Sequence, residues 1–356
     1  MLNPLRLTVD PLAAMLNCEL AHHPVYDGLE LQWFDDDRHG TGMLAFLSRR
    51  VGRKVDYYFQ PGLRLDPAHY SIGGGTGTWT ETAFDVARLR VTDDGVDAEV
   101  RFSDVDGRSI EIRVDDRDGR PRRRAGLLAP VGSGIEHPTA LMLVWMPGFD
   151  LVRATGTPPV IRIDGDDADT GRLPGARLHR RHLIKYAAPL VAVDVNPDRD
   201  GPLSPSGPDD VVVPGQSVEL TPDGSGIAAI TAETGGHVAR LRLDPALPDL
   251  AELPDGASID GAWRVAVDGT RLTGGRWRAT RTGERVELAM HVTERWRPRR
   301  LPLLMRMVTT LLPVFRSWPT TYRWRADLTL EPATLTSRWE RTTSDAGEAY
   351  RRATGS

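Results

Sequence analysis

Two adjacent tyrosines and one histidine are the residues of this sequence whose types and positions suit acid–base chemistry beside apolar strands. Tyr57 and Tyr58 stand together in "KVDYYF", and His137 directly precedes the apolar run "PTALMLVWMPGFDLV". A phenol can donate a hydrogen bond to a substrate carbonyl, and an imidazole can donate a proton near neutral pH. We therefore take Tyr57, Tyr58 and His137 as candidate catalytic residues, with an ordinary loop histidine as the alternative for His137.

The apolar run at residues 139–152 is the best candidate for the wall of a binding cavity. Apolar side chains occupy both faces of a strand there, so the strand is expected to be buried on both sides. It is either a central strand between two layers or a strand whose inner face lines a cavity for a hydrophobic ligand. With two aromatic residues nearer the N-terminus, the candidate ligand-binding residues are Trp33, Phe46, Leu143, Trp145 and Met146.

Composition and missing motifs exclude several other kinds of site. The single cysteine, Cys18, excludes an intramolecular disulfide and a cysteine-based zinc site, and the serine nucleophile motif G-x-S-x-G is absent. We expect neither a metal nor a cofactor. A net charge of −4 and a pI near 6.2 show no bias toward nucleic acid, which we do not expect as a partner.

The distribution of apolar residues predicts no stable membrane insertion. No run approaches the roughly eighteen consecutive apolar residues of a membrane span. The first residues, "MLNPLRLTVD", lack the charged start and continuous apolar core of a signal peptide. We expect a cytoplasmic protein on these grounds.

A glycine-rich stretch, "SIGGGTGTWTET", raises the question of a phosphate-binding loop. Its glycines match neither G-x-G-x-x-G nor G-x-x-x-x-G-K-[ST], and the residues after Trp79 do not have a helical pattern. We therefore expect the glycines to serve a sharp turn and Trp79 to be structural. The form Gly-x-Trp recurs at Gly261 and at Gly275.

The elements that would position these residues are mostly β-strands. Apolar and polar residues alternate through residues 87–114, and Asp94-Gly95 and Asp106-Gly107 interrupt the alternation as hairpin turns do. The same pattern returns at residues 263–290 and 322–330. Strands joined by short turns predict an all-β protein of two antiparallel halves, each a barrel or a curved sheet, with one large β-sandwich as the alternative.

The chain is expected to divide near its middle. Residues 196–210, "NPDRDGPLSPSGPDD", concentrate proline, glycine, serine and aspartate and predict a linker or long loop. The expected domains are therefore 1–195 and 211–356. Within the second, residues 301–317 predict an amphipathic helix whose apolar stripe includes Met307 and Leu311. That stripe either packs across a barrel mouth or between the halves, or lies in a membrane interface, or forms a lid for a hydrophobic ligand.

Two features of the sequence resemble lipocalin-like proteins. A Gly-x-Trp at the start of a strand, as at Gly77 to Trp79, resembles the lipocalin signature in which the indole plugs the closed end of a barrel. The early aromatic segment "LELQWFDDD" and the two β-rich halves resemble, more loosely, the two-barrel family of the carotenoid 1,2-hydratases and AttH-type proteins. The family's Glu-Trp-Trp-Tyr run stands here as Leu31-Gln32-Trp33-Phe34, which departs from its pattern.

Three functions remain open at this level. The resemblance implies a cofactor-free enzyme that hydrates or cyclises a polyene or polyketide-like substrate in an apolar cavity, where preorganisation supplies much of the rate. The same cavity could instead hold a lipid without chemistry, as in a carrier protein. A β-sandwich that processes carbohydrates would instead show an open cleft with exposed aromatic residues and paired carboxylates.

Overall fold

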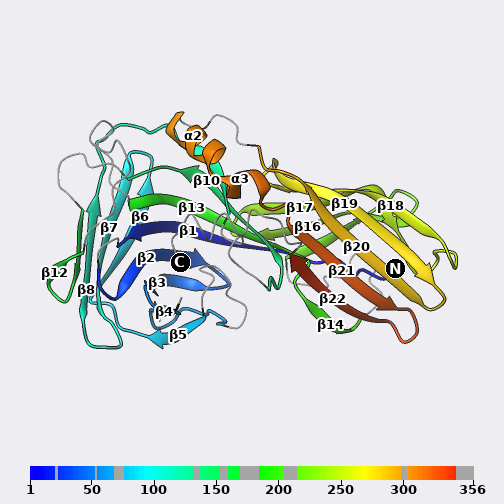
Figure 1. Cartoon of the computed structure of the whole chain (residues 1–356), viewed down its shortest axis with the longest axis horizontal. Helices are drawn as coiled ribbons and strands as arrows, with labels where there is room; N and C mark the ends of the chain where they lie inside the picture. Colours follow the sequence, from blue (N-terminus) through cyan, green and yellow to red (C-terminus); the bar gives the residue numbers. More distant parts are fainter. Residues whose placement is uncertain are drawn as a thin grey trace. The chain divides into compact units, whose positions relative to one another are not determined.

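The computed structural model describes residues 1–20, 23–52, 54–67, 76–130, 137–152, 159–168, 184–203, 215–297, 301 and 303–341. In these residues the chain forms strands in three sheets, with two short helices, α2 (Leu303–Leu311) and α3 (Pro313–Ser317) (Figure 1). The expected all-β class with few helices is confirmed. Among the described residues each sheet ends at two edge strands, so the sheets are open there and none is closed into a barrel.

The first sheet has eight strands. Their bounds are β1 (Leu7–Glu19), β2 (Tyr26–Asp36), β3 (Gly40–Arg49), β4 (Lys54–Phe59), β5 (Thr76–Glu81), β9 (Ala125–Ala129), β10 (Leu141–Phe149) and β13 (Ile184–Val195). The order is β5-β4-β3-β2-β1-β13-β10-β9, and β4 and β5 pair in parallel. Residues Leu141 to Met146 of β10 are all buried, which confirms the strand expected to be covered on both faces.

The second sheet has five strands in the order β12-β11-β8-β7-β6. Their bounds are β6 (Val86–Thr92), β7 (Gly95–Ser103), β8 (Ser109–Asp115), β11 (Val160–Ile163) and β12 (Asp166–Asp167). Its apolar face packs in one core with one face of β1 to β4, and this core includes Leu31, Tyr58, Val100 and Ile112. This part of the chain is therefore a two-layer β-sandwich, and its alternating residues form the core.

The third sheet has nine strands in the order β14-β22-β21-β20-β19-β18-β17-β16-β15. Their bounds are β14 (Arg199–Pro202), β15 (Gln216–Leu220), β16 (Gly226–Thr234), β17 (His237–Pro248), β18 (Ser258–Val267), β19 (Thr270–Thr282), β20 (Arg285–Glu294), β21 (Tyr322–Thr329) and β22 (Thr334–Arg341). Trp263, Trp277 and Trp324 are fully buried on one face, and arginines alternate with them on the other.

The chain divides into two compact units that are discontinuous in sequence. Unit 1 comprises Met1–Asp10, Leu128–Trp145 and Val191–Ser356, and unit 2 comprises Pro11–Leu127 and Met146–Leu190. Strands β1, β9, β10 and β13 each contribute residues to both units. In the expected linker, residues 204–210 lie outside the described residues, whereas Arg199–Pro202 form β14 and pair with β22.

The Gly-x-Trp repeats have a direct structural cause in unit 1. Strands β18 and β19 pair so that Gly261 lies opposite Trp277 and Gly275 lies opposite Trp263. A Cβ on Gly261 would lie 2.5 Å from the Nε1 atom of Trp277, and one on Gly275 would lie 1.7 Å from the carbonyl oxygen of His291. A side chain at either position would therefore clash with the indole or backbone of the neighbouring strand, so glycine is required there.

Trp79 does not close a barrel, because its sheet is open. It lies on the edge strand β5, where its ring stacks on Tyr57. A Cβ on Gly77 would lie 1.5 Å from the carbonyl oxygen of Val55, so this glycine permits the close parallel pairing of β5 with β4. The glycines at 73–75 lie outside the described residues.

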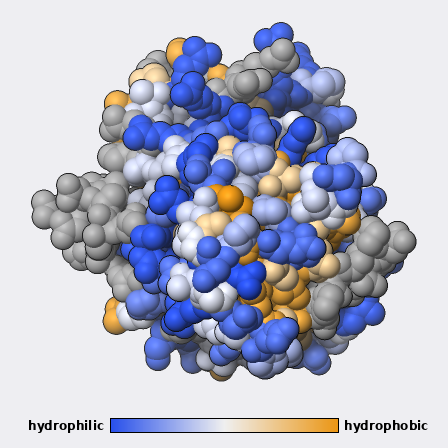
Figure 2. All heavy atoms as spheres, turned by 90° about the vertical axis from the view of Figure 1, so that its right-hand side faces the viewer, coloured by the Kyte–Doolittle hydropathy of each residue, from blue (hydrophilic) through white to orange (hydrophobic). Residues whose placement is uncertain are grey.

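The amphipathic helix is shorter than its pattern predicts. It is divided at Leu312 into α2 and α3, and Pro313 begins the second. Of the alternatives for the apolar stripe, packing against the protein is wrong at Met307 and Leu311, because both side chains are exposed. None of the helices in the described ranges is long and apolar enough to cross a bilayer. Figure 2 shows one face with mostly hydrophilic residues around a smaller hydrophobic patch.

Candidate functional site

A buried carboxylate lies on the face of β2 that points away from the sandwich core. Glu30 and Gln32 are two residues apart on this strand and share a face, and Glu30 lies opposite Asn17 of β1. The Asn17 Nδ2 and Gln32 Nε2 atoms donate to the two oxygens of Glu30, each at 2.6 Å. Glu30 and Gln32 are buried. Two neutral amide donors thus fix the position of this carboxylate on a rigid strand.

A row of aromatic side chains continues the same face across β3, β4 and β5. Phe46 lies opposite both Glu30 and Tyr57, and Tyr57 lies opposite Trp79. The ring centroids of Phe46 and Tyr57 are 5.6 Å apart, and those of Tyr57 and Trp79 are 4.3 Å apart and nearly parallel. We call Asn17, Glu30, Gln32, Phe46, Tyr57 and Trp79 the Glu30 face. It combines a row of aromatic rings, of which Phe46 and Tyr57 are buried, with a fixed carboxylate.

Two of the candidate residues lie on the opposite face of these strands. Tyr58 is fully buried in the sandwich core, where its ring centroid lies 5.1 Å from that of Phe102 and its hydroxyl accepts a hydrogen bond from the Val105 N–H at 3.3 Å. Burial raises the pKa of Tyr58. Trp33 packs against the same core. Since adjacent residues of a strand face opposite sides, Tyr57 and Tyr58 cannot both belong to one site.

The three candidate ligand-binding residues on β10, Leu143, Trp145 and Met146, are buried. Leu143 and Met146 are fully buried, and Trp145 makes an edge contact with Trp296 at 6.5 Å between centroids. Leu143 and Trp145 lie opposite Val193 and Val191 of β13. The structure therefore brings Phe46 and Tyr57 together on one face, and it places Leu143 and Trp145 two residues apart along another strand.

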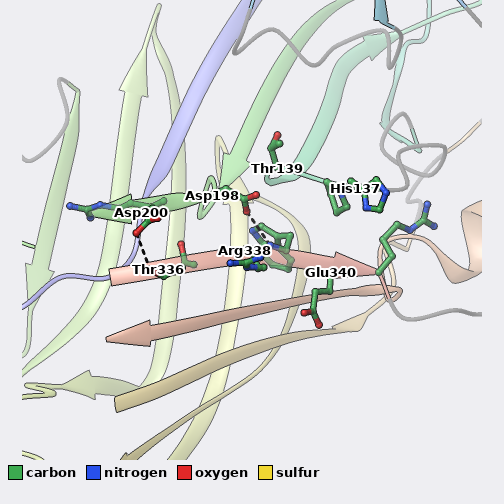
Figure 3. Close-up of a pocket in the computed structure, with 12 residues that line it drawn as sticks. His137, Thr139, Asp198, Asp200, Thr336, Arg338 and Glu340 are labelled. Carbon is green, nitrogen blue, oxygen red and sulfur yellow. Dashed lines mark hydrogen bonds between the residues drawn. The ribbon is translucent and has the colours of Figure 1, made fainter. Parts of the chain in front are cut away.

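His137 lies in a polar pocket of unit 1, which Figure 3 shows. The pocket has a volume of about 820 Å³. It is lined by residues 137–139, by residues 198–200 at the start of β14, and by residues 336–341 of β22. Its lining residues carry charges of both signs and several hydroxyls. They are His137, Pro138, Thr139, Asp198, Arg199, Asp200, Thr336, Ser337, Arg338, Trp339, Glu340 and Arg341.

Two carboxylates of this pocket are held by β22. The Trp339 N–H donates to Asp198 Oδ1 at 3.1 Å, and the Thr336 hydroxyl donates to Asp200 Oδ1 at 3.0 Å. Desolvation raises the pKa of Asp198, although the Trp339 N–H and the nearby Arg338 oppose the shift. The residue is exposed overall, so the shift carries little energy. The pocket can thus offer carboxylates, hydroxyls and guanidinium groups to a polar ligand.

Two groups of site residues, on β2 and near β14, have only weak signals in the sequence. Glu30 and Gln32 alternate with apolar residues inside "LELQWF", and a polar residue facing inward on a β-strand is such a signal. Asp198 and Asp200 fell within the expected linker, where acidic residues usually mark a solvated loop. Comparison with protein-family models, with curated proteins and with solved structures gives no match for this chain. The geometry of these two sites therefore carries the functional argument.

Proposed function

We propose that the protein binds a hydrophobic small molecule that carries a hydroxyl or carbonyl group, and that the Glu30 face contacts this ligand. The observation that carries the proposal is a buried carboxylate, held at 2.6 Å by two amides, in line with three aromatic rings. Aromatic rings supply apolar contact, while a few fixed polar groups orient a ligand. Unit 2 thus offers both components on one strand face.

Cofactor-free hydration or cyclisation of a polyene or polyketide-like substrate is the reaction class that this face suits. Glu30 would exchange a proton with the substrate, since its two amide partners hold it in one orientation. Phe46 and Tyr57 would hold the hydrophobic chain against the strands. A carrier protein is the alternative, because the same face can bind a ligand without proton transfer.

Native mass spectrometry of the purified protein tests the binding step. We expect a co-purified hydrophobic molecule that is lost in Phe46→Ala/Tyr57→Ala, provided that circular dichroism shows an intact fold. Glu30→Gln keeps the size of the side chain and removes its charge. If the protein is an enzyme, this variant should still bind the substrate and accumulate it unconverted. Glu111→Gln, on β8 of the second sheet, is the matched control.

The outcomes separate the alternatives. If Glu30→Gln releases the same molecule as the parent protein, the face acts as a carrier site. If neither the purified protein nor the protein incubated with a lipid extract retains any hydrophobic molecule, the proposal is wrong.

A second candidate function is carbohydrate binding in the polar pocket. The observation that favours it is a pair of carboxylates, Asp198 and Asp200, in an open pocket that also presents Arg338. Such groups bind and cleave sugars, although the aromatic residue of this lining, Trp339, is buried. Titration calorimetry with a panel of oligosaccharides, repeated with Asp198→Asn/Asp200→Asn, tests this function. It is excluded if no heat of binding is detected at millimolar sugar.

A further inference from the structure

Helix α2 exposes a row of large apolar side chains. Leu303, Met307 and Leu311 are 72%, 52% and 69% exposed, and Leu312, which follows the helix, is 42% exposed. Residues four apart lie along one side of an α-helix, so the first three form a single stripe. In the described part of the chain the other large hydrophobic residues with comparable exposure occur singly, and they are Val51, Val105 and Val238.

The sequence around this stripe is strongly basic. Residues 295–326 contain eight arginines and no aspartate, glutamate or lysine, in a chain whose net charge is −4. Arg295, Arg297 and Arg306 are exposed, and none of the ion pairs found among the described residues involves them. Their charge is therefore available to an anionic partner.

We propose that α2 docks reversibly on the surface of an anionic phospholipid bilayer. A short helix with an apolar stripe and flanking arginines suits a position in the plane of the interface, where the stripe enters the acyl boundary and the guanidinium groups contact phosphates. Anionic lipids attract each such cation, and the attraction weakens as salt screens it. Charge complementarity favours this partner over a second copy of this chain, whose α2 would bring like charges together.

This proposal is independent of the Glu30 face. Binding to a bilayer is measured with the protein and vesicles alone, whereas ligand retention is measured without vesicles. Failure of one proposal therefore leaves the other standing.

Vesicle flotation tests the docking directly. We expect the full chain to float with vesicles that contain phosphatidylglycerol and phosphatidylcholine, to float much less with phosphatidylcholine alone, and to be released at high salt. Leu303→Ser/Met307→Ser/Leu311→Ser should lower partitioning by on the order of a thousandfold, since each large apolar side chain contributes roughly tenfold.

Two further variants make the test specific. Val51→Ser/Val105→Ser/Val238→Ser changes three exposed apolar residues elsewhere and should bind vesicles like the parent protein. Arg295→Gln/Arg297→Gln/Arg306→Gln should lose most of the preference for anionic vesicles while the helix keeps its stripe. Circular dichroism confirms that each variant is folded.

Three outcomes overturn the proposal. In the first, the parent protein does not float with anionic vesicles. In the second, the apolar triple variant floats as well as the parent. In the third, the parent does not bind vesicles, and sedimentation shows that it is a dimer which the apolar substitutions dissociate. In the third case the occupant of the stripe is a second copy of the chain.

Discussion

At the scale of single residues, the reciprocal glycine and tryptophan pairs decide how closely two strands of unit 1 approach. Trp263 and Trp277 are both fully buried, and each lies opposite the glycine of the other motif. A tryptophan covers a large apolar area, so a neighbour without a side chain is needed where the indole lies across the adjacent strand. The two motifs therefore form one packing unit.

Gly261→Ala should destabilise the protein by about 1–3 kcal/mol, the usual effect of forcing an extra methyl group into a packed core. The new Cβ would meet three atoms of the Trp277 indole between 2.5 and 2.8 Å, and a buried ring cannot rotate away easily. Urea unfolding gives the free energy of unfolding. Gly28→Ala is the matched control, because its Cβ would meet the nearest atoms at 3.7 Å or more. Equal losses in both variants would contradict this explanation.

A second residue-scale feature is the buried network around Asp104 in unit 2. Its carboxylate accepts hydrogen bonds from the Tyr26 hydroxyl at 3.0 Å and from Arg108 Nε at 2.7 Å, and its side chain is fully buried. Burial alone would raise the pKa of Asp104, but the donors from Arg108 and Tyr26 outweigh it, and the pKa lies below its ordinary value. The network ties the β7–β8 turn to β2.

Asp104→Asn should cost about 1–3 kcal/mol at neutral pH, because it weakens hydrogen bonds to a buried charge. A folded-state pKa below the unfolded value of about 3.9 means that the stabilisation is present above that value and is lost as the pH falls through the folded-state pKa. The parent protein should therefore lose more stability than the variant between pH 5 and pH 2. Urea titrations at these pH values measure the free energy of unfolding, and Asp85→Asn, at an exposed residue, is the control. Parallel pH profiles for parent and variant would refute this role.

At the scale of elements, the turns were easier to predict than the pairings. Gly107, Gly269 and Gly283 have positive φ angles of 79°, 75° and 58°, as the Asp-Gly and Thr-Gly turns required. The meander of β6, β7 and β8 and that of β18, β19 and β20 follow from local residues and are confirmed. The parallel pair of β4 with β5 and the pairing of β14 with β22 join residues distant in sequence, where no local pattern specifies the partner.

The Glu30 face, too, could be predicted only in part from local sequence. Alternation predicts that Tyr57 and Tyr58 face opposite sides, but not which side holds the sandwich core, because the second sheet decides it. Phe46 and Tyr57 were found from their type. Glu30 was missed because a glutamate in a strand is usually solvated. The amides of Asn17 and Gln32 that hold it come from pairing and register.

The outer face of β19, β20 and β21 places a histidine between arginines. His291 lies opposite Arg276 on one side and Arg323 on the other. Burial lowers the pKa of His291, and the charges of Arg323, Arg325 and Arg278 lower it further. The folded protein therefore disfavours protonation of this imidazole.

His291→Gln should flatten the dependence of stability on pH just below neutrality. The folded-state pKa lies below the unfolded value of about 6.5, so the unfolded chain binds more protons in that window and stability falls as the pH is lowered through it. Thermal melts of parent and variant between pH 7.5 and pH 5 measure the slope, and His137→Gln, on an exposed segment, is the control. An unchanged slope in His291→Gln would show that other groups dominate.

At the scale of the whole molecule, the chain passes between the two units within four strands rather than through one connection. β1, β9, β10 and β13 each contribute backbone to both units. Melting of either unit would therefore release part of each of these strands. This arrangement favours coupled unfolding over two independent domains.

We expect a single unfolding transition in which a core truncation in one unit lowers the stability of both. Leu89→Ala in unit 2 and Leu241→Ala in unit 1 remove buried side chains and should each cost about 2–5 kcal/mol. Hydrogen exchange followed by mass spectrometry reports on peptides from each unit separately. Loss of protection confined to the truncated unit would show that the units unfold independently.

Because the tryptophans are unevenly distributed, the intrinsic fluorescence of the protein reports mainly on unit 1. Of nine tryptophans, Trp33 and Trp79 belong to unit 2, which leaves seven in unit 1. Trp263, Trp277 and Trp324 are shielded from water, so they should emit at the blue end of the indole range and resist collisional quenchers. The partly exposed Trp79 should be quenched first. Intrinsic emission therefore follows unit 1, whereas a change at the Glu30 face reaches the spectrum mainly through Trp79.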